Sequence, residues 1–149
     1  MAAMWADPIV TRHIGGRAFT EQECWFRLLR YLGHWALLGY GYWAIEEKAS
    51  GRFAGETGFA DFKRELVPPI HGVPEIGWAL APWAHGKGYA AEAVGAAVEW
   101  GSQHLPSRRT VCLIDPGNLR SIKLAQNLGY RQYAEATLGT SKTLLFERT

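Results

Sequence analysis

The sequence predicts a single α/β domain, in which a mixed and mostly antiparallel sheet carries helices on both faces. Strand-like and helix-like runs alternate in the order β-β-β-α-β-α-β-β along the 149 residues. The run 109–114 is almost continuously apolar, as in a central buried strand. The segment 88–103 is rich in alanine and places small apolar residues on one helical stripe, which permits close packing on a sheet.

The N-terminal part is expected to be helical. Residues 1–16 predict the end of one helix and a turn. Thr20 and Glu23 have the spacing of a capping box, so a further helix is expected to begin there and to end at Gly33. The predicted apolar face of this helix comprises Cys24, Leu28, Leu29 and Leu32.

A β-hairpin is predicted at 39–62, because aromatic and β-branched residues lie on both sides of a glycine-containing turn. Glu56 lies among small residues on its returning strand. The segment 63–72 predicts a loop, and loops of this length often line binding sites. The next predicted strand, 74–80, carries a second acidic residue, Glu75.

The composition excludes several classes of protein. Apolar residues make up 48% and charged residues 20% of the chain, as in a folded globular protein. The formal net charge is only +2 and no basic run is present, which predicts no nucleic-acid partner. The longest uncharged stretch, 32–45, is too short to span a membrane. Two distant cysteines and the absence of a signal-like N-terminus predict a cytoplasmic protein, and no histidine pair has the spacing of metal ligands.

The stretch 82–93 carries the strongest functional signal, because a predicted strand passes through a glycine-containing turn into a helix. The first N–H groups of a helix have no intrahelical partner and lie at the positive end of its macrodipole. Gly86 and Gly88 allow close approach of an anion to the backbone, and Lys87 adds a cation. We therefore predict that residues 85–90 hold a pyrophosphate.

Two common phosphate-binding patterns fit this loop poorly. The Walker pattern requires Ser or Thr where this chain has Tyr89. The dinucleotide pattern Gly-x-Gly-x-x-Gly is met only loosely, with Ala91 in the third position, and it should follow the first strand of its unit. A nucleotide-binding α/β protein is therefore the weakest of the functions considered.

A third pattern fits better. His85-Gly86-Lys87-Gly88-Tyr89-Ala90 resembles the Gln/Arg-x-x-Gly-x-Gly/Ala loop of the GNAT family of N-acetyltransferases. A second match, Asn118-Leu119-Arg120-Ser121 with Leu128-Gly129-Tyr130, resembles the Asn-x-x-Ser helix of that family, which closes with Leu-Gly-Phe. The resemblance covers the chain from about Ala6 onward and is closest to the RimJ/RimL-like branch.

The resemblance implies the acyl-CoA N-acyltransferase fold, with acetyl-CoA as co-substrate. The strand 74–80 is similar to the fourth strand of that fold, which splays from its neighbour and holds the acyl-CoA arm with free backbone groups. The residues implied in acetyl-CoA binding are Trp78, Ala79, Leu80, His85, Gly86, Lys87, Gly88, Tyr89, Ala90 and Asn118. The usual first strand of the family has no counterpart here. Because an uncovered strand edge invites pairing with a second chain, a homodimer is one expectation.

The implied reaction is direct attack of a primary amine on acetyl-CoA in a ternary complex. A lysine-like amine has a pKa of about 10.4, so a base must take its proton. Glu75 is the favoured base, because it lies on the strand that should hold the thioester, and Glu56 is the alternative. Glu92 is expected only to interact favourably with the helix dipole.

The leaving thiolate benefits from an acid. Family members usually supply a tyrosine four residues after the serine of Asn-x-x-Ser, where this chain has Ala125. Ser121 is the expected replacement, and local hydrogen bonding in the first turn of a helix is the other interpretation of this serine. Tyr130 is expected in the core. Three tryptophans are candidates for shaping the acceptor site: Trp35, Trp43 and Trp83.

The sequence thus predicts an N-acetyltransferase that acts on a protein N-terminus or a small-molecule amine. A polycationic acceptor of the aminoglycoside type fits poorly, because the chain is not rich in acidic residues. The alternative, from a different functional class, is an acyl-CoA-binding module with little catalytic activity, which the missing tyrosine favours.

Overall fold

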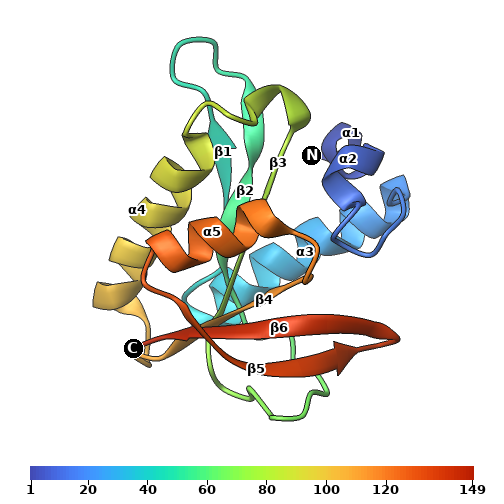
Figure 1. Cartoon of the computed structure of the whole chain (residues 1–149). Coiled ribbons are helices and arrows are strands. Elements are labelled where there is room, and N and C mark those ends of the chain that lie inside the picture. The colour runs from blue at the N-terminus through green and yellow to red at the C-terminus, as the bar shows by residue number, and fades with distance from the viewer.

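A six-stranded sheet with the strand order β1-β2-β3-β4-β6-β5 forms the centre of the molecule (Figure 1). The computed structural model describes the whole chain, Met1–Thr149. The strands are β1 (Tyr42–Glu46), β2 (Phe53–Ala60), β3 (Glu75–Leu80), β4 (Thr110–Ile114), β5 (Arg131–Leu138) and β6 (Ser141–Arg148). Only β3 and β4 pair in parallel, so the predicted mixed and mostly antiparallel sheet is confirmed.

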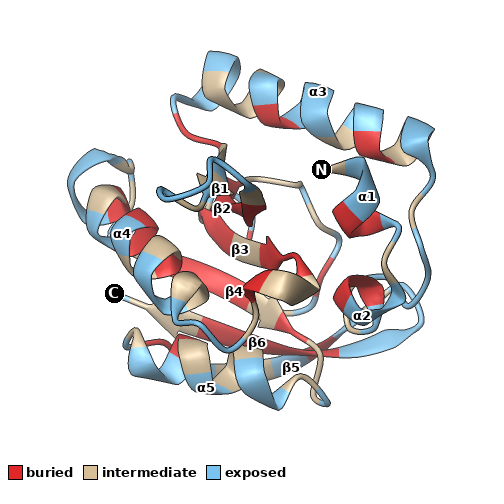
Figure 2. Cartoon of the chain, turned by 90° about the horizontal axis from the view of Figure 1, so that it is seen from above, coloured by how far each residue is buried: buried red, intermediate tan, exposed pale blue.

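Helices cover both faces of this sheet, as Figure 2 shows most clearly. They are α1 (Ala2–Trp5), α2 (Pro8–Thr11), α3 (Glu21–Leu38), α4 (Tyr89–His104) and α5 (Leu119–Asn127), with one 3₁₀ turn, η1 (Pro82–Ala84). The helices α4 and α5 pack on one face, and α1, α2 and α3 lie on the other. None of these helices combines the length and the apolar character that crossing a bilayer requires.

The helix α3 begins at the predicted capping box but does not end where the sequence predicted. The Thr20 hydroxyl accepts from the backbone of Glu23, and the Glu23 carboxylate accepts from the backbone of Thr20. The helix continues through Gly33 to Leu38, because one interior glycine costs only about 1 kcal/mol and packing outweighs it. The predicted apolar face was also wrong, since Cys24 and Tyr31 are buried whereas the leucines are 38–60% exposed: Leu28, Leu29 and Leu32.

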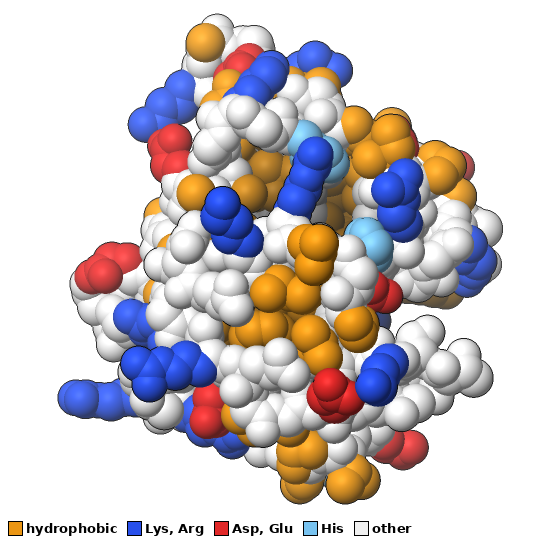
Figure 3. Space-filling view, viewed as in Figure 1, with side chains coloured by type: hydrophobic (Ala, Val, Ile, Leu, Met, Phe, Trp, Pro, Cys, Tyr) orange, Lys and Arg blue, Asp and Glu red, His pale blue; other side chains and the backbone are white.

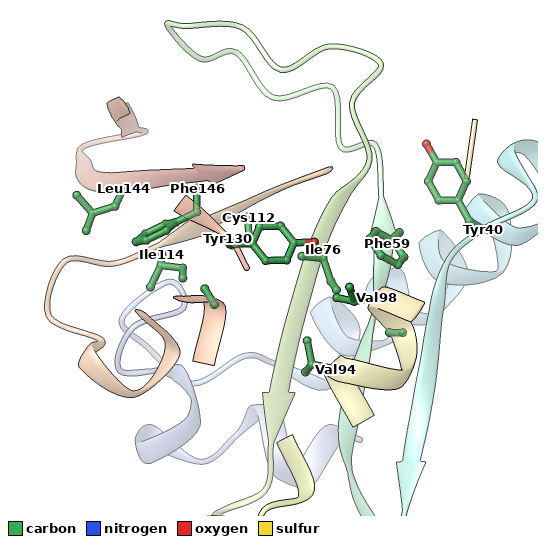
Figure 4. Packing of buried hydrophobic residues seen from close by; sticks show 12 residues of the cluster. Tyr40, Phe59, Ile76, Val94, Val98, Cys112, Ile114, Tyr130, Leu144 and Phe146 are labelled. Carbon is green, nitrogen blue, oxygen red and sulfur yellow. The ribbon is translucent and has the colours of Figure 1, made fainter. Parts of the chain in front are cut away.

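The main core lies between the sheet and the helices α4 and α5 (Figure 4). As predicted, α4 presents a stripe of small residues to the sheet, including Val94, Ala97 and Gly101. A Cβ on Gly101 would stand 2.8 Å from the Phe59 ring, so only glycine permits this approach. Tyr130 is buried in the same core, with its hydroxyl 2.7 Å from that of Thr110, and its expected core position is confirmed.

The strands β3 and β4 separate after a single point of contact. β3 pairs with β2 along its whole length, but with β4 only where Glu75 lies opposite Val111. Successive residues of a strand direct their peptide groups to opposite edges. Because the N–H of Ala81 bonds to the carbonyl of Ala54 on β2, the peptide groups of Trp78 and Leu80 point to the opened β4 side. The expected splay is therefore present.

Candidate active site

Two adjoining cavities open from the splay between β3 and β4. The first, called here the loop cavity, has a volume of about 740 Å³ and is lined by the loop after β3 and the start of α5. The second, the sheet cavity, has a volume of about 730 Å³ and lies over β2 and β3. Trp78, Asn118 and Ser121 line both cavities, so the two meet at these residues. Figure 3 shows hydrophobic side chains in a hollow between α5 and the N-terminal helices, with Lys and Arg side chains around it.

The loop before α4 has the features of a phosphate site. Gly86 and Gly88 have φ angles of 70° and 82°, which favour glycine, and a Cβ on either would meet no protein atom within 4 Å. None of the backbone N–H groups from Gly86 to Ala91 donates a hydrogen bond to another protein group. Gly88 provides no side chain to cap the helix. This row of free donors fits a pyrophosphate at the start of an α-helix.

The side chains of this loop make contacts within the protein. The Nε2 atom of His85 lies 2.8 Å from the carbonyl oxygen of Leu80, so His85 ties the loop to the end of β3. Lys87 stacks 5.1 Å from the centre of the Trp83 ring and does not line the loop cavity. The Tyr89 hydroxyl donates to Glu47. The backbone of the loop, more than its side chains, is thus arranged to bind an anion.

Four further basic residues line the loop cavity, and sequence reasoning missed them: Arg12, His13, Arg120 and Lys123. Arg120 and Lys123 lie beside the predicted Asn-x-x-Ser helix start, so their proximity could have been inferred from α5. Nothing in the sequence places the turn after α2 beside that helix. The contact is made by His13, whose Nδ1 lies 3.2 Å from Oδ1 of Asp115, just before α5.

Ser121 lies at the junction of the two cavities. Its hydroxyl oxygen accepts a hydrogen bond from the Trp78 indole N–H at 3.2 Å. Its backbone N–H donates to the Asn118 side chain at 3.2 Å, so Asn118 caps α5 as well as lining both cavities. The Ser121 hydroxyl proton has no acceptor within the protein and remains available. Ala125 is fully buried on the core side of the same helix.

Glu75 is held in a bidentate ion pair. Its two carboxylate oxygens accept from Nε and Nη2 of Arg64 at 2.6 and 2.8 Å. Glu75 is 5% exposed, and Arg64 comes from the loop after β2. Both residues line the sheet cavity, so the predicted carboxylate is in the site but both of its oxygens have a partner.

Glu56 lies in the same cavity without an ion pair. It stands opposite Ala79 in the β2–β3 register, next to the opened part of β3. Its carboxylate accepts from the Tyr31 hydroxyl, which itself accepts from Arg27 at 3.1 Å. Burial raises the pKa of Glu56, and the hydrogen bond from Tyr31 partly opposes this rise. Tyr31 was not predicted here, because it is 25 residues from Glu56 in sequence.

The other acidic and aromatic candidates lie away from the sheet cavity. Glu92 is exposed on the outer face of α4. Trp35 and Trp43 contact each other and Trp100 edge to face, and Trp83 packs under Lys87. None of the three suggested tryptophans lines the sheet cavity. The aromatic side chains that do line it are Trp5, Tyr42, Phe62 and Trp78.

The sequence profile of the acetyltransferase (GNAT) domain matches residues 1–131. The chain belongs to the GNAT acetyltransferase family. This membership agrees with the splayed strands and with the free N–H groups of the loop, and it establishes acetyl-CoA-dependent acyl transfer as the general chemistry of the family.

Similar proteins agree with the GNAT assignment. The chain is 37% identical over 93 residues to the uncharacterized protein YkkB of Bacillus subtilis, and this match covers 61% of the chain and 52% of YkkB. The chain thus spans about half of that relative's length. It is 29% identical over 129 residues to the uncharacterized N-acetyltransferase p20 of Bacillus licheniformis, covering 86% of the chain and 70% of p20.

Among solved structures, a protein from Bordetella pertussis assigned to the GNAT acetyltransferases superposes with a TM-score of 0.86. The two are 33% identical, and the match covers 99% of this chain and 87% of the other. The aminoglycoside acetyltransferase AAC(6')-Ib in complex with coenzyme A has a TM-score of 0.79 at 17% identity, over 99% of this chain and 86% of the other, and shares the fold.

Proposed function

We propose that this GNAT protein transfers the acetyl group of acetyl-CoA to a primary amine by direct attack in a ternary complex. The observation that carries the proposal is the junction of the two cavities at Trp78 and Ser121. The free N–H groups of 86–91 would hold the pyrophosphate, and the opened edge of β3 would hold the pantetheine arm. The sheet cavity would then receive the amine.

In this reaction the amine nitrogen forms a bond to the thioester carbonyl carbon, and the carbon–sulfur bond breaks. The nitrogen gives up one proton to a base, and the thiolate takes up one proton from an acid or from water. Acetyl-CoA supplies an already activated acyl group, so the protein needs to orient the amine and move these protons. Peptide N–H groups on the open edge of β3, at Trp78 and Leu80, would stabilise negative charge on the carbonyl oxygen.

Of the two carboxylates expected to act as base, the contacts favour Glu56. A carboxylate whose pKa is raised by burial accepts a proton more readily near neutral pH. Protonation of Glu75 would weaken one of the two charge-assisted hydrogen bonds from Arg64. Glu75 also lies at the closed end of the splay, about 13 Å along β3 from Ala79, the residue opposite Glu56.

Ser121 is the proposed acid, or the group that orients a water to the thiolate. Its oxygen is fixed by Trp78, and its proton is free. The presence of serine here and alanine at 125 also supports placement in the RimJ/RimL-like branch. A cytoplasmic location is consistent with two free, buried cysteines.

The first test is thermal unfolding with acetyl-CoA, followed by thiol release with a panel of primary amines. A ligand present at 100 times its dissociation constant stabilises a protein by roughly 2.7 kcal/mol, which is readily measured. Stabilisation by acetyl-CoA together with amine-dependent thiol release supports the enzyme. Stabilisation without release by any amine supports the acyl-CoA-binding module instead, and no stabilisation of a folded protein contradicts both.

A further inference from the structure

The sheet cavity is unusually basic for a pocket expected to receive an amine. Its lining includes five Lys or Arg side chains, namely Arg12, Arg27, Arg30, Arg64 and Lys142. Only three carboxylates line it: Glu56, Glu75 and Asp115. The chain as a whole has a formal net charge of only +2, so positive charge is concentrated in this cavity.

The carboxylates of the cavity already have partners. Glu75 pairs with Arg64, Asp115 contacts His13, and Glu56 accepts from Tyr31. Several of the cations in the cavity, by contrast, have no acidic partner. Arg27 and Arg30 form no ion pair with any acidic group of the protein, and the guanidinium group of Arg30 donates no hydrogen bond.

The guanidinium groups of Arg30 and Arg64 lie beside one aromatic ring, whereas that of Arg27 lies 4.1 Å from the centre of the Trp5 ring in the same cavity. The guanidinium carbons of Arg30 and Arg64 lie 4.9 and 4.7 Å from the centre of the same Phe62 ring. Arg27 lies one helical turn before Arg30 on α3 and donates to Tyr31 at 3.1 Å. Arg30 is exposed as a residue, but its guanidinium is partly desolvated at the cavity, and this, followed by the positive charge of Arg27 and Arg64, lowers the pKa of Arg30. Converging like charges of this kind are relieved when an anion binds among them.

The phosphates of acetyl-CoA do not account for this cluster. The basic residues beside the predicted phosphate loop are Arg12, His13, Arg120 and Lys123. Arg27, Arg30 and Arg64 line the sheet cavity and not the loop cavity. They therefore lie in the cavity proposed to receive the amine, together with Glu56 and Glu75, the two candidates to take its proton.

We propose that Arg27, Arg30 and Arg64 form an anion subsite of the acceptor pocket, and that the acceptor is a primary amine that also carries a carboxylate, as an amino acid does. The inference rests on the proposed acetyl transfer and names its substrate class. Guanidinium groups bind carboxylates through paired N–H donors, and their positive charge also favours the neutral, reactive form of a nearby amine. The same charges repel a polycationic acceptor.

The test compares amines that differ only in the anionic group. Thiol release is measured with β-alanine and β-alaninamide, and then with 4-aminobutyrate, 6-aminohexanoate and their amides. The acid of at least one pair is expected to have a higher kcat/KM than its amide. In Arg30→Gln, the KM for that acid should rise by about 10- to 100-fold, while the values for the amide, which lacks the carboxylate, should change much less. Equal use of acid and amide in every pair, or an equal effect of Arg30→Gln on both, would overturn the proposal.

The control is Arg131→Gln, an exposed arginine of β5 that forms no ion pair and lines neither cavity. Its kinetics should match those of the unchanged protein for both members of each pair. Circular dichroism and thermal unfolding confirm that both variants are folded. This is expected for Arg30→Gln, because Arg30 is exposed on α3 and glutamine is a good helix former.

A binding measurement separates failure of this proposal from failure of acetyl transfer. Calorimetry with N-acetyl-β-alanine and its amide, in the presence of coenzyme A, requires no turnover. Binding of the acid, with a loss of affinity of about tenfold or more in Arg30→Gln, supports the subsite even if no amine is acetylated. Absence of binding by the acid, or binding that Arg30→Gln leaves unchanged, contradicts it even if other amines are substrates.

Discussion

Arg64 binds both carboxylate oxygens of Glu75, with Nε and Nη2 at 2.6 and 2.8 Å from them. The pair joins the loop after β2 to the first residue of β3, at the only point where β3 and β4 are paired. It therefore closes the splay at one end. A carboxylate in this position supports the architecture of the site, and in the proposed mechanism the proton transfer is assigned to Glu56.

The first prediction is that Arg64→Met destabilises the protein strongly. The substitution leaves the Glu75 carboxylate, whose side chain is 7% exposed, buried without a partner. Breaking a buried ion pair from one side costs about 3–5 kcal/mol, and we expect the lower value because Arg64 retains some exposure.

Urea unfolding measures the change in the free energy of unfolding. Arg131→Met is the control, because Arg131 is an exposed arginine of β5 that forms no ion pair, and it should change the free energy of unfolding little. Equal effects of the two substitutions would show that the Arg64–Glu75 pair does not stabilise the fold.

The second prediction concerns the pH dependence of stability at Glu56. Burial raises the pKa of Glu56 above its ordinary value of 4.5, so the folded protein binds this proton more tightly than the unfolded chain does. Stability from this group is complete below 4.5 and declines as the pH rises through the raised pKa. The Glu56→Gln variant has no carboxyl group at this position, so its stability lacks this dependence on pH.

Thermal unfolding from pH 4 upward should therefore show the melting temperature of Glu56→Gln rising relative to that of the original protein, until the raised pKa is passed. The amide oxygen can still accept from Tyr31, so the variant should fold. A constant difference in melting temperature across the whole range would mean that Glu56 does not titrate as its burial implies.

The third prediction is that Glu56→Gln reduces kcat much more than Glu75→Gln does. Loss of a general base costs about 10²- to 10⁴-fold, and the remaining rate of Glu56→Gln should lose the rise with pH that ionisation of Glu56 produces. Steady-state thiol release at several pH values provides the measurement. If Glu75→Gln suffers the larger loss of kcat while its melting temperature is retained, the roles of the two carboxylates are the reverse of those proposed.

Much of the fold was predictable from the sequence because its signals are local. The order of the strands, the small-residue stripe of α4 and the turn from Gly86 to Gly88 depend on residues close together in the chain. The interpretation of α3 failed for the opposite reason. This helix has apolar side chains around most of its circumference, and only packing determines that Cys24 and Tyr31 face inward.

The acceptor side of the site could not be predicted from the sequence in the same way. Arg27 and Arg30 lie on a helix where charged residues usually face water, and nothing local indicates that Arg30 and Arg64 meet at the Phe62 ring. The Tyr31–Glu56 contact likewise depends on where α3 crosses β2. The two expected carboxylates were found in one cavity, but their different partners became visible only in three dimensions.

The fourth prediction is that Gly88→Ala weakens acetyl-CoA binding. At φ 82° the alanine is strained by about 1–2 kcal/mol, and its methyl group projects into open space at the loop cavity. We expect the dissociation constant for acetyl-CoA to rise about tenfold, equivalent to ~1.4 kcal/mol. Gly72→Ala is the control, since Gly72 has φ 74° and similar open space outside the loop cavity. A similar loss of affinity in both variants would assign the effect to general strain.

The fifth prediction separates a chemical role of Ser121 from a structural one. Ser121→Ala removes the free hydroxyl proton. If this hydroxyl acts as the acid, kcat should fall by about 100-fold. This is the lower end of the roughly 10²- to 10⁴-fold contribution of acid–base groups, because a thiolate is a good leaving group. The dissociation constant for acetyl-CoA should stay unchanged. Trp78→Phe keeps the aromatic ring but removes the indole N–H that fixes Ser121, so its loss of kcat should be smaller. If Ser121→Ala instead loses affinity for acetyl-CoA and keeps its kcat, the serine serves to shape the start of α5 and water protonates the thiolate.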